Sequence, residues 1–291
     1  MEGTYFRGMG FDGQIRAFAA DTREIVEYAR ERHGLTPTTT AAFGRALTAG
    51  AMMGVMLKDQ QRVSIQIKGN GPIGQIVVDA NALGEVRGYV DEPHIDLPLK
   101  PNGKLDVSGA VGSEGFIHVT KDIGLREPYR GGVPIISGEL GEDFTYYFAQ
   151  SEQTPSAVSL GVLVNEAQQP AVIAAGGFLV QVMPGTTDDV IALIEQNISQ
   201  TPPVTQMLND GLGLAEILAH VLGTVTRLEE GKLSYKCNCS KERVERALIS
   251  VNKQDLQEIL EEDGQVELTC HFCNSKYLFD GDDLQRLIAR Q

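Results

Sequence analysis

The chain has 291 residues, a formal net charge of −14 at pH 7 and a hydrophobic fraction of 42%. This length and composition predict a globular protein of about two domains with a sizeable core. The acidic balance argues against nucleic acids and anionic membranes as partners, because both attract clustered Lys and Arg. The sequence shows neither a membrane-spanning apolar run nor a signal peptide. We therefore expect a cytoplasmic protein.

The first 184 residues carry the periodicities of strands and helices, and they predict an α/β (α+β) core, residues 1–184, with a largely antiparallel sheet. One helix is expected to begin at Asp21 or Thr22 and to end at Gly34, and Thr36-Pro37 opens another. The other predicted elements are strand pieces within 5–20, a meander over 62–90, a strand at 116–120, a mobile loop at 128–141, a helix at 142–150, two central antiparallel strands at 157–164 and 171–183, and a helix at 188–198.

One glycine-rich stretch formally matches a dinucleotide-binding motif. Gly69-Asn-Gly-Pro-Ile-Gly74 has the G-x-G-x-x-G spacing, which binds phosphates only where the amino terminus of a helix follows. Here Pro72 and a β-patterned run follow, so the pattern favours a hairpin turn. The core also lacks a nucleophile elbow, a P-loop and an H-E-x-x-H motif, and the five histidines of the whole chain are dispersed. The sequence predicts that the protein is not an enzyme.

Residues 185–231 predict a helical linker. Its second half carries an apolar helical stripe that must pack on another surface, formed by Leu214, Ile217, Leu218, Val221, Leu222 and Val225. Prolines and glycines interrupt the segment, and each glycine inside a helix costs about 1 kcal/mol. A helix weakened in this way is held mainly by the surface on which it docks. Two interpretations stay open here, a conformational switch and an ordinary connection between helices.

Every cysteine of the chain lies in the segment 232–291, which we predict as a small separate domain. Cys237 and Cys239 form a C-x-C pair, and Cys270 and Cys273 form a C-x-x-C pair. Two such pairs can surround one metal ion tetrahedrally, which is the closed geometry of a structural Zn²⁺ site. Cysteines that only fill a core would be scattered, and permanent disulfides would need an oxidising compartment. We therefore predict one zinc ion bound by four thiolates.

The predicted zinc domain has few apolar residues for its length. Helices are expected after Ser240 and Asn252, but the core is marginal, so removal of the metal should unfold the domain. His271 lies between the thiolates and is a candidate for a spare metal ligand, although four cysteines already close the site.

Oxidation can remove the metal, because a disulfide cannot serve as a ligand pair. Residues two apart on an extended strand have Cα atoms about 6.6 Å apart, near the upper limit of about 6.8 Å for a disulfide. A disulfide within the C-x-C pair would be strained and easily reduced, while permanent structural zinc remains the alternative.

Four stretches resemble a single protein family when they are taken together. They are the C-x-C…C-x-x-C pattern, Ile67-Lys-Gly-Asn-Gly-Pro72, Tyr146-Tyr-Phe-Ala-Gln-Ser-Glu-Gln-Thr-Pro155 and Ala174-Ala-Gly-Gly-Phe-Leu-Val-Gln-Val-Met-Pro184. This combination resembles the heat shock protein 33 family, the redox-regulated molecular chaperones of bacteria. The resemblance extends over essentially the whole chain.

The resemblance implies a cytoplasmic holdase that needs no ATP. In the inactive, reduced state Cys237, Cys239, Cys270 and Cys273 would bind one Zn²⁺, and the linker around 185–231 would be folded on the α/β core. Under oxidants, often with heat, the resemblance implies the disulfides Cys237–Cys239 and Cys270–Cys273, followed by zinc release and unfolding of the zinc domain and linker. Active homodimers would then hold unfolding client proteins.

Two hypotheses from other functional classes stay open. A zinc-ribbon adaptor would bind a protein or a nucleic acid constitutively, and it would keep its metal under peroxide. A thiol oxidoreductase would use Cys270-His-Phe-Cys273 to turn over dithiol substrates, but the βαβ context expected around such a motif is missing.

Overall fold

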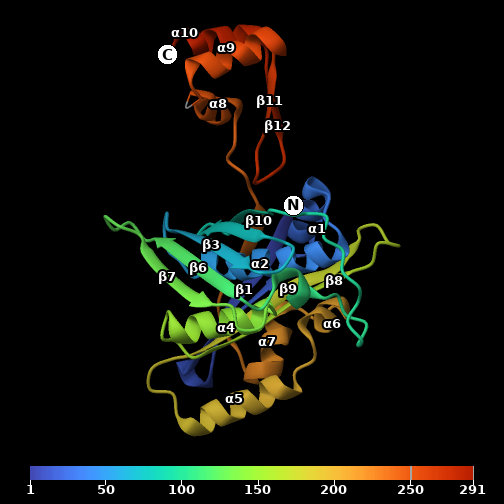
Figure 1. Ribbon diagram of the computed structural model, residues 1–291. Coiled ribbons are helices and arrows are strands. Elements are labelled where there is room, and N and C mark those ends of the chain that lie inside the picture. The colour runs from blue at the N-terminus through green and yellow to red at the C-terminus, as the bar shows by residue number, and fades with distance from the viewer. Residues whose placement is uncertain (250, 291) are drawn as a thin grey trace. The chain divides into compact units, whose positions relative to one another are not determined.

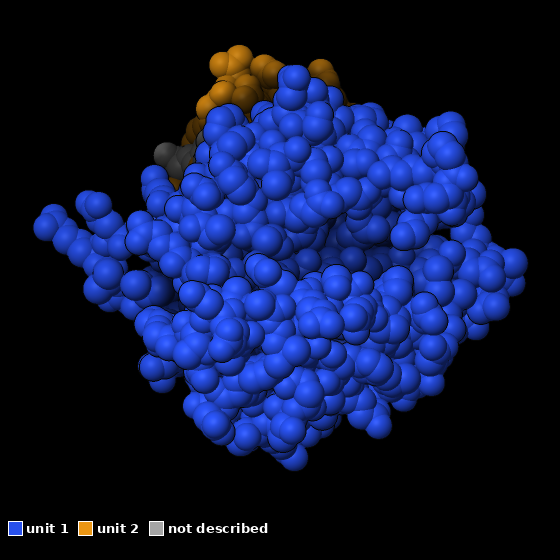
Figure 2. All heavy atoms as spheres, turned by 90° about the horizontal axis from the view of Figure 1, so that it is seen from below, with its two compact units in different colours: residues 1–236 blue, residues 237–291 orange. Residues whose placement is uncertain are grey.

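The computed structural model describes residues 1–249 and 251–290 of the protein. The chain divides into two compact units, residues 1–236 and residues 237–291, which Figure 2 colours separately. The predicted linker, 185–231, belongs to the first unit by its contacts. Its behaviour as a separate folding segment stays a prediction.

The first unit is built on one large sheet (Figure 1), which has ten strands in the order β7-β6-β3-β4-β5-β10-β1-β2-β9-β8. Its neighbouring strands are antiparallel, except that β10 and β5 run parallel. The predicted α/β fold with a largely antiparallel sheet is therefore confirmed. The strands are β1 (Glu2–Gly10), β2 (Ile15–Asp21), β3 (Arg62–Gly69), β4 (Gln75–Asn81), β5 (Glu85–Val90), β6 (Gly115–Asp122), β7 (Tyr129–Pro134), β8 (Ser156–Val164), β9 (Val172–Val182) and β10 (Thr226–Tyr235).

Helix α2 (Pro37–Val55) packs on strands from both halves of this sheet. All of its residues except Pro37 and Arg45 are buried. Small side chains allow this close approach: a Cβ added at Gly50 would lie 2.5 Å from Val78 Cγ1 of β4. The Ala, Gly and Met content of the segment thus reflects a helix surrounded on every side, and the prediction of a closely crossing core helix is confirmed.

Strand alternation creates two separate hydrophobic cores on the two faces of the sheet. Phe18 of β2 and Leu179 of β9 belong to the core around α2. Their neighbours Ala19 and Phe178 belong to the other core, which the helices of the predicted linker cover. Successive side chains of a strand point to opposite faces, so this sheet is covered by helices on both sides. The two short helices that complete the first face are α3 (Val107–Val111) and α4 (Leu140–Gln150).

Helix α1 (Arg23–His33) begins after Thr22 and ends at Gly34, whose φ of 63° is the left-handed conformation that terminates helices. Both ends agree with the prediction. The helix also carries a buried carboxylate, Glu27, which fixes the start of β9. Val172 N donates to Glu27 Oε2 at 2.9 Å, and Arg30 Nη2 donates to Oε1 at 2.7 Å. Burial alone would raise the pKa of Glu27, but these hydrogen bonds bring it below its usual value.

The substitution Glu27→Gln is expected to lower the free energy of unfolding by about 1.5–3 kcal/mol at pH 7, because it weakens charge-assisted hydrogen bonds. A depressed folded-state pKa contributes stability above the unfolded pKa, and this contribution disappears as the pH falls through the folded-state value. The deficit of the variant should therefore shrink in acid. Urea unfolding at pH 7 and at progressively lower pH measures it, with Glu31→Gln, an exposed glutamate of the same helix, as control. An equal deficit at every pH would contradict this assignment.

Three expectations about the first unit are wrong in detail. The segment 128–141 is not a loop throughout, because it contains the edge strand β7, which pairs with β6. Most side chains of β7 are exposed, so its sequence lacks the apolar alternation that would have predicted a strand. Strand β8 is not central but forms the opposite edge, and its apolar sequence reflects coverage by α2, α4 and α6 (Val204–Asn209). Residues 226–231 are not helical, because they open strand β10. The G-x-G-x-x-G stretch joins β3 to β4, as the hairpin prediction required.

Residues 237–249 and 251–290 of the second unit form a two-stranded sheet, three helices and a small core. Asn252 and Asp280 cap two of the helices through their side chains, each accepting a backbone N–H three residues ahead. The buried core residues are Leu248, Leu256, Phe279, Leu284 and Leu287. The elements are α8 (Lys241–Ile249), α9 (Lys253–Glu262), β11 (Val266–Thr269), β12 (Lys276–Phe279) and α10 (Gly281–Ala289).

Candidate metal centre

The four cysteines come together from two segments that lie 31 positions apart in sequence, counted from Cys239 to Cys270. Cys237 and Cys239 precede α8, while Cys270 and Cys273 stand in the turn between β11 and β12. Cys237 Sγ lies 3.7 Å from Cys270 Sγ, and Cys239 Sγ lies 3.2 Å from Cys273 Sγ. All four sulfur atoms lie within 4.8 Å of one another. The predicted ligand set is therefore gathered at one point.

This sulfur cluster has the dimensions of a closed zinc site. Four sulfurs at a Zn–S distance of about 2.3 Å in a tetrahedron are separated by about 3.8 Å. The Sγ–Sγ distances of 3.7 and 3.2 Å and the limit of 4.8 Å for all pairs are compatible with that value. Soft thiolates favour zinc over hard cations such as Mg²⁺. The four cysteines can therefore hold a metal ion. His271 is exposed and is not a member of the cluster.

The C-x-x-C turn is shaped by backbone hydrogen bonds. Cys270 N donates to Ser275 O at 2.9 Å, and Asn274 N donates to Cys270 O at 2.7 Å. Asn274 has a φ of 54°, a left-handed conformation that asparagine tolerates better than most residues. The strand pairing closes directly behind the turn, at Thr269 and Lys276. The hairpin thus presents two sulfurs to the same side from a fixed loop.

Among the described residues, the hydroxyl groups of Tyr277 and Ser275 contact the sulfur cluster, and neither was predicted from the sequence. Tyr277 Oη donates to Cys239 Sγ at 3.1 Å, and Cys273 Sγ lies 3.3 Å from Ser275 Oγ. The bond to Cys239 raises the pKa of Tyr277 to about 12. A sequence signal exists, since the alternation that buries Phe279 places Tyr277 on the same face of β12. That signal becomes visible only after β12 and its partner strand have been assigned.

The thiols of the cluster differ in acidity when no metal is bound. Burial raises the pKa of Cys237 to about 12, and burial also raises the pKa of Cys270. Burial acts in the same direction on Cys273, but hydrogen bonds with Ser275 and Cys239 bring the pKa of Cys273 down to about 7. Four neighbouring thiolates repel one another, so a cation is needed to hold all of them deprotonated.

The second core of the first unit holds the predicted linker against the sheet. Helix α6 packs on β8 and β9, and α7 (Leu214–Leu222) packs on β1 and β2. The predicted apolar stripe is confirmed within α7, where Ile217, Leu218, Val221 and Leu222 are buried. Its last predicted member, Val225, lies beyond the end of the helix and is partly buried against the same core. The sheet supplies Phe6, Ile15, Ala17, Ala19, Phe178 and Val180 to this core, and α5 (Asp188–Gln200) adds Ile194.

The glycines of the linker do not lie inside its helices, contrary to expectation. Gly213 is the N-cap of α7, and Gly223 is its C-cap with a φ of 69°. Gly211, with a φ of 85°, follows α6. These glycines therefore separate short helices, and they impose no propensity cost within any of them. Short helices are marginal in isolation, so the docking surface still determines whether they form.

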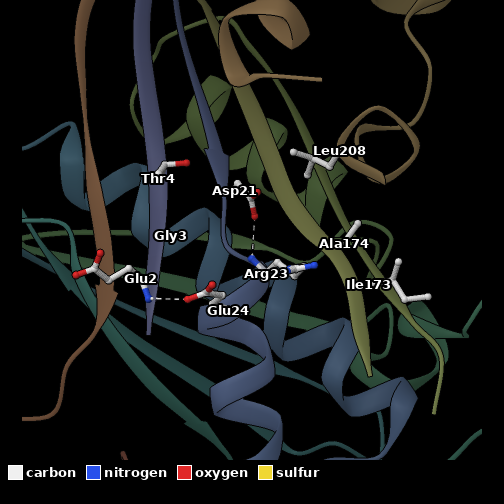
Figure 3. Close-up of a pocket in the computed structure, with 9 residues that line it drawn as sticks. All are labelled: Glu2, Gly3, Thr4, Asp21, Arg23, Glu24, Ile173, Ala174 and Leu208. Atoms are coloured by element: carbon white, nitrogen blue, oxygen red, sulfur yellow. Dashed lines mark hydrogen bonds between the residues drawn. The ribbon is translucent and has the colours of Figure 1, made fainter. Parts of the chain in front are cut away.

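A shallow hollow of about 200 Å³ marks the contact between α6 and the sheet (Figure 3). Leu208 of α6 lines it together with Ala174 of β9, and the start of β1 lines it as well. Two hydrogen bonds within the unit join groups that line it: Glu2 N donates to Glu24 Oε2 at 3.4 Å, and Arg23 N donates to Asp21 Oδ1 at 3.0 Å. We assign no ligand to this hollow.

The fold and the sulfur cluster can be compared with known proteins. A family model described as "Hsp33 protein" matches residues 4–280. The chain belongs to the Hsp33 family. This assignment makes it a chaperone and confirms the resemblance inferred from the sequence motifs.

Relatives and a solved structure of the Hsp33 family match almost the whole chain. The chain is 52% identical over 283 residues to a 33 kDa chaperonin of Geobacillus sp. (strain WCH70), covering 97% of this chain and 95% of that protein. It is 49% identical over 282 residues to a 33 kDa chaperonin of Brevibacillus brevis, covering 97% of each. The crystal structure of the 33 kDa chaperonin (heat shock protein 33 homolog) of Thermotoga maritima superposes with a TM-score of 0.93 at 37% identity, covering 99% of this chain and 98% of the other. Within residues 1–249 and 251–290, no helix has both the length and the apolarity needed to cross a membrane.

Proposed function

We propose that the protein is a redox-regulated holdase of the cytoplasm, which binds unfolding proteins without using ATP. The observation that carries the proposal is the cluster of four sulfurs within 4.8 Å of one another, in a chain that matches the Hsp33 family over almost its whole length. In the reduced state Cys237, Cys239, Cys270 and Cys273 hold one Zn²⁺. The bound zinc supplies the cross-link that keeps the second unit folded, and the chaperone is then inactive.

Oxidation converts the ligands into disulfides that no longer bind the metal. Two thiolates transfer two electrons to hydrogen peroxide, which takes up two protons and leaves as two water molecules, and one S–S bond forms. The reduced cluster places Cys237 near Cys270 and Cys239 near Cys273. Once the metal leaves, the two segments separate, whereas cysteines two or three positions apart in the chain stay close to each other. This favours the pairs Cys237–Cys239 and Cys270–Cys273.

Strand β10 connects the metal centre to the linker core. It ends at Tyr235, two positions before Cys237, and of its ten described residues Leu233 alone is buried. Its side chains contact β1 through the exposed ion pair of Lys232 with Glu2, a kind of pair that contributes little to stability, and through the hydrogen bond that Tyr5 Oη donates to Glu229 Oε1 at 2.6 Å. A strand held mainly by backbone hydrogen bonds can be released when the unit that follows it unfolds.

Release of the linker would uncover the sheet face on which α6 and α7 pack. That face presents Phe6, Ile15, Phe178 and other apolar residues, and contiguous exposed apolar surface captures unfolded chains. The same exposed surface accounts for the proposed homodimer of the oxidised protein. We propose no nucleic-acid or membrane partner.

The decisive experiment follows zinc, thiols and client aggregation in one sample. Peroxide is added to the reduced protein at elevated temperature, and we expect zinc release, loss of free thiols and suppressed light scattering of an unfolding client to appear together. Reductant should reverse all three. Reduced protein heated without oxidant is the control. Zinc that stays bound, or zinc release without holding activity, would favour permanent structural zinc and the adaptor hypothesis.

A further inference from the structure

The hydroxyl group of Tyr277 joins the two halves of the sulfur cluster. Tyr277 belongs to β12, on the C-x-x-C hairpin, whereas its partner Cys239 belongs to the C-x-C segment. Ser275, by contrast, contacts Cys273 two positions before it in the same hairpin. Each cysteine pair thus has one side-chain hydroxyl beside one of its sulfurs, and of these two hydroxyl contacts the one made by Tyr277 bridges the two segments.

We propose that Tyr277 is a positioning residue that holds Cys239 in the metal-binding arrangement and restrains its reactivity toward electrophiles. Ser275 has the corresponding role for Cys273. The proposal rests on the zinc site of the proposed function, and it adds two residues outside the four ligands. According to this proposal, two residues of the C-x-x-C hairpin position one sulfur in each cysteine pair: Tyr277 positions Cys239, and Ser275 positions Cys273.

The physical basis is the charge on a metal-bound thiolate. When the thiols are deprotonated, both hydroxyl groups act as donors, and a hydrogen bond to an anionic sulfur is charge-assisted. Such a bond occupies a lone pair through which the sulfur would attack an electrophile. It also fixes the direction in which the sulfur faces the metal. Partners of this kind around metal ligands typically change metal affinity by about 10–100-fold when they are removed.

Other contacts keep the C-x-C segment attached to its unit when the phenol oxygen is removed. Lys241 Nζ pairs with Asp283 Oδ2 at 2.6 Å and lies 5.1 Å from the centre of the Phe279 ring. Leu248 of α8 is buried in the core of the unit. Tyr277→Phe keeps the aromatic ring, so the substitution removes the sulfur contact while the surrounding packing remains.

The test compares Tyr277→Phe with Ser275→Ala in the full-length, reduced, zinc-loaded protein. Iodoacetamide is the probe: the attacked sulfur forms a bond to the CH₂ carbon, iodide leaves, and a thioether remains. Mass mapping gives the alkylation rate of each cysteine. We expect Tyr277→Phe to raise the rate at Cys239 about tenfold relative to Cys273, and Ser275→Ala to shift the ratio the other way. Zinc transfer to a competing chelator should accelerate about tenfold in Tyr277→Phe.

The two variants control for each other. Tyr146→Phe removes the hydroxyl of a half-buried tyrosine of the first unit, and it should leave the alkylation rates of all four cysteines unchanged. An unchanged ratio, or an equal rise at all four cysteines, would overturn the inference, because a loosened fold exposes every sulfur alike. A wild-type protein that does not bind one zinc per chain would instead overturn the proposed function. The two failures are therefore distinguishable.

Discussion

Removal of zinc from the reduced protein is expected to unfold residues 237–291 while β3, β4 and β6 of the first unit stay folded. Among the described residues of the second unit, five buried apolar residues form its core, which is small for the length of the unit. Structural zinc contributes an apparent binding free energy of about 10–16 kcal/mol in small zinc domains. Without the metal, burial also raises the pKa values of Cys237 and Cys270, so these cysteines become neutral thiols that no longer cross-link the segments.

Hydrogen exchange measured by mass spectrometry gives a direct readout of this unfolding. After chelation under reducing conditions, amides of α8, α9 and α10 should lose nearly all protection, and readdition of zinc should restore it. The variant Cys273→Ser should behave like the chelated protein. Retained protection of α9 and α10 after complete zinc removal would show that the small core suffices without the metal.

The substitution Ile217→Asp is expected to release the linker helices and to give a chaperone that is active while reduced and zinc-bound. The side chain of Ile217 is fully buried between α7 and the sheet. An unpaired carboxylate at such a site costs several kcal/mol, enough to undock helices that are short and depend on that surface. The core around α2 lies on the other face of the sheet and keeps the first unit folded.

Exchange of amides in 188–222, zinc content and client light scattering together test this expectation. Ala215→Asp is the matched control, because Ala215 is exposed on the same helix. It should leave all three measurements unchanged. If Ile217→Asp frees α5–α7 without suppressing aggregation, the linker does not cover the client-binding surface, and that part of the proposed function is wrong.

Much of the local structure could be predicted from the sequence because its causes are local. The bounds of α1 follow from Thr22 and Gly34, and the G-x-G-x-x-G stretch is a turn because a strand pattern follows it. The zinc prediction was equally local, since each C-x-C or C-x-x-C pair brings two donors together within one short segment. The apolar stripe of α7 indicated that this helix had to dock, although it did not indicate on which surface.

Strand order and the surroundings of the metal ligands were decided by the tertiary structure. Strand β10 lies between β1 and β5 although its sequence is charged, because backbone hydrogen bonds hold it and such bonds have no side-chain signature. Strand β8 is apolar at a sheet edge because helices cover it there. Tyr277 reaches Cys239 only after the hairpin and the C-x-C segment have come together. The sequence determined that four cysteines can bind a metal, and the long-range pairing of segments determined which other side chains contact those cysteines.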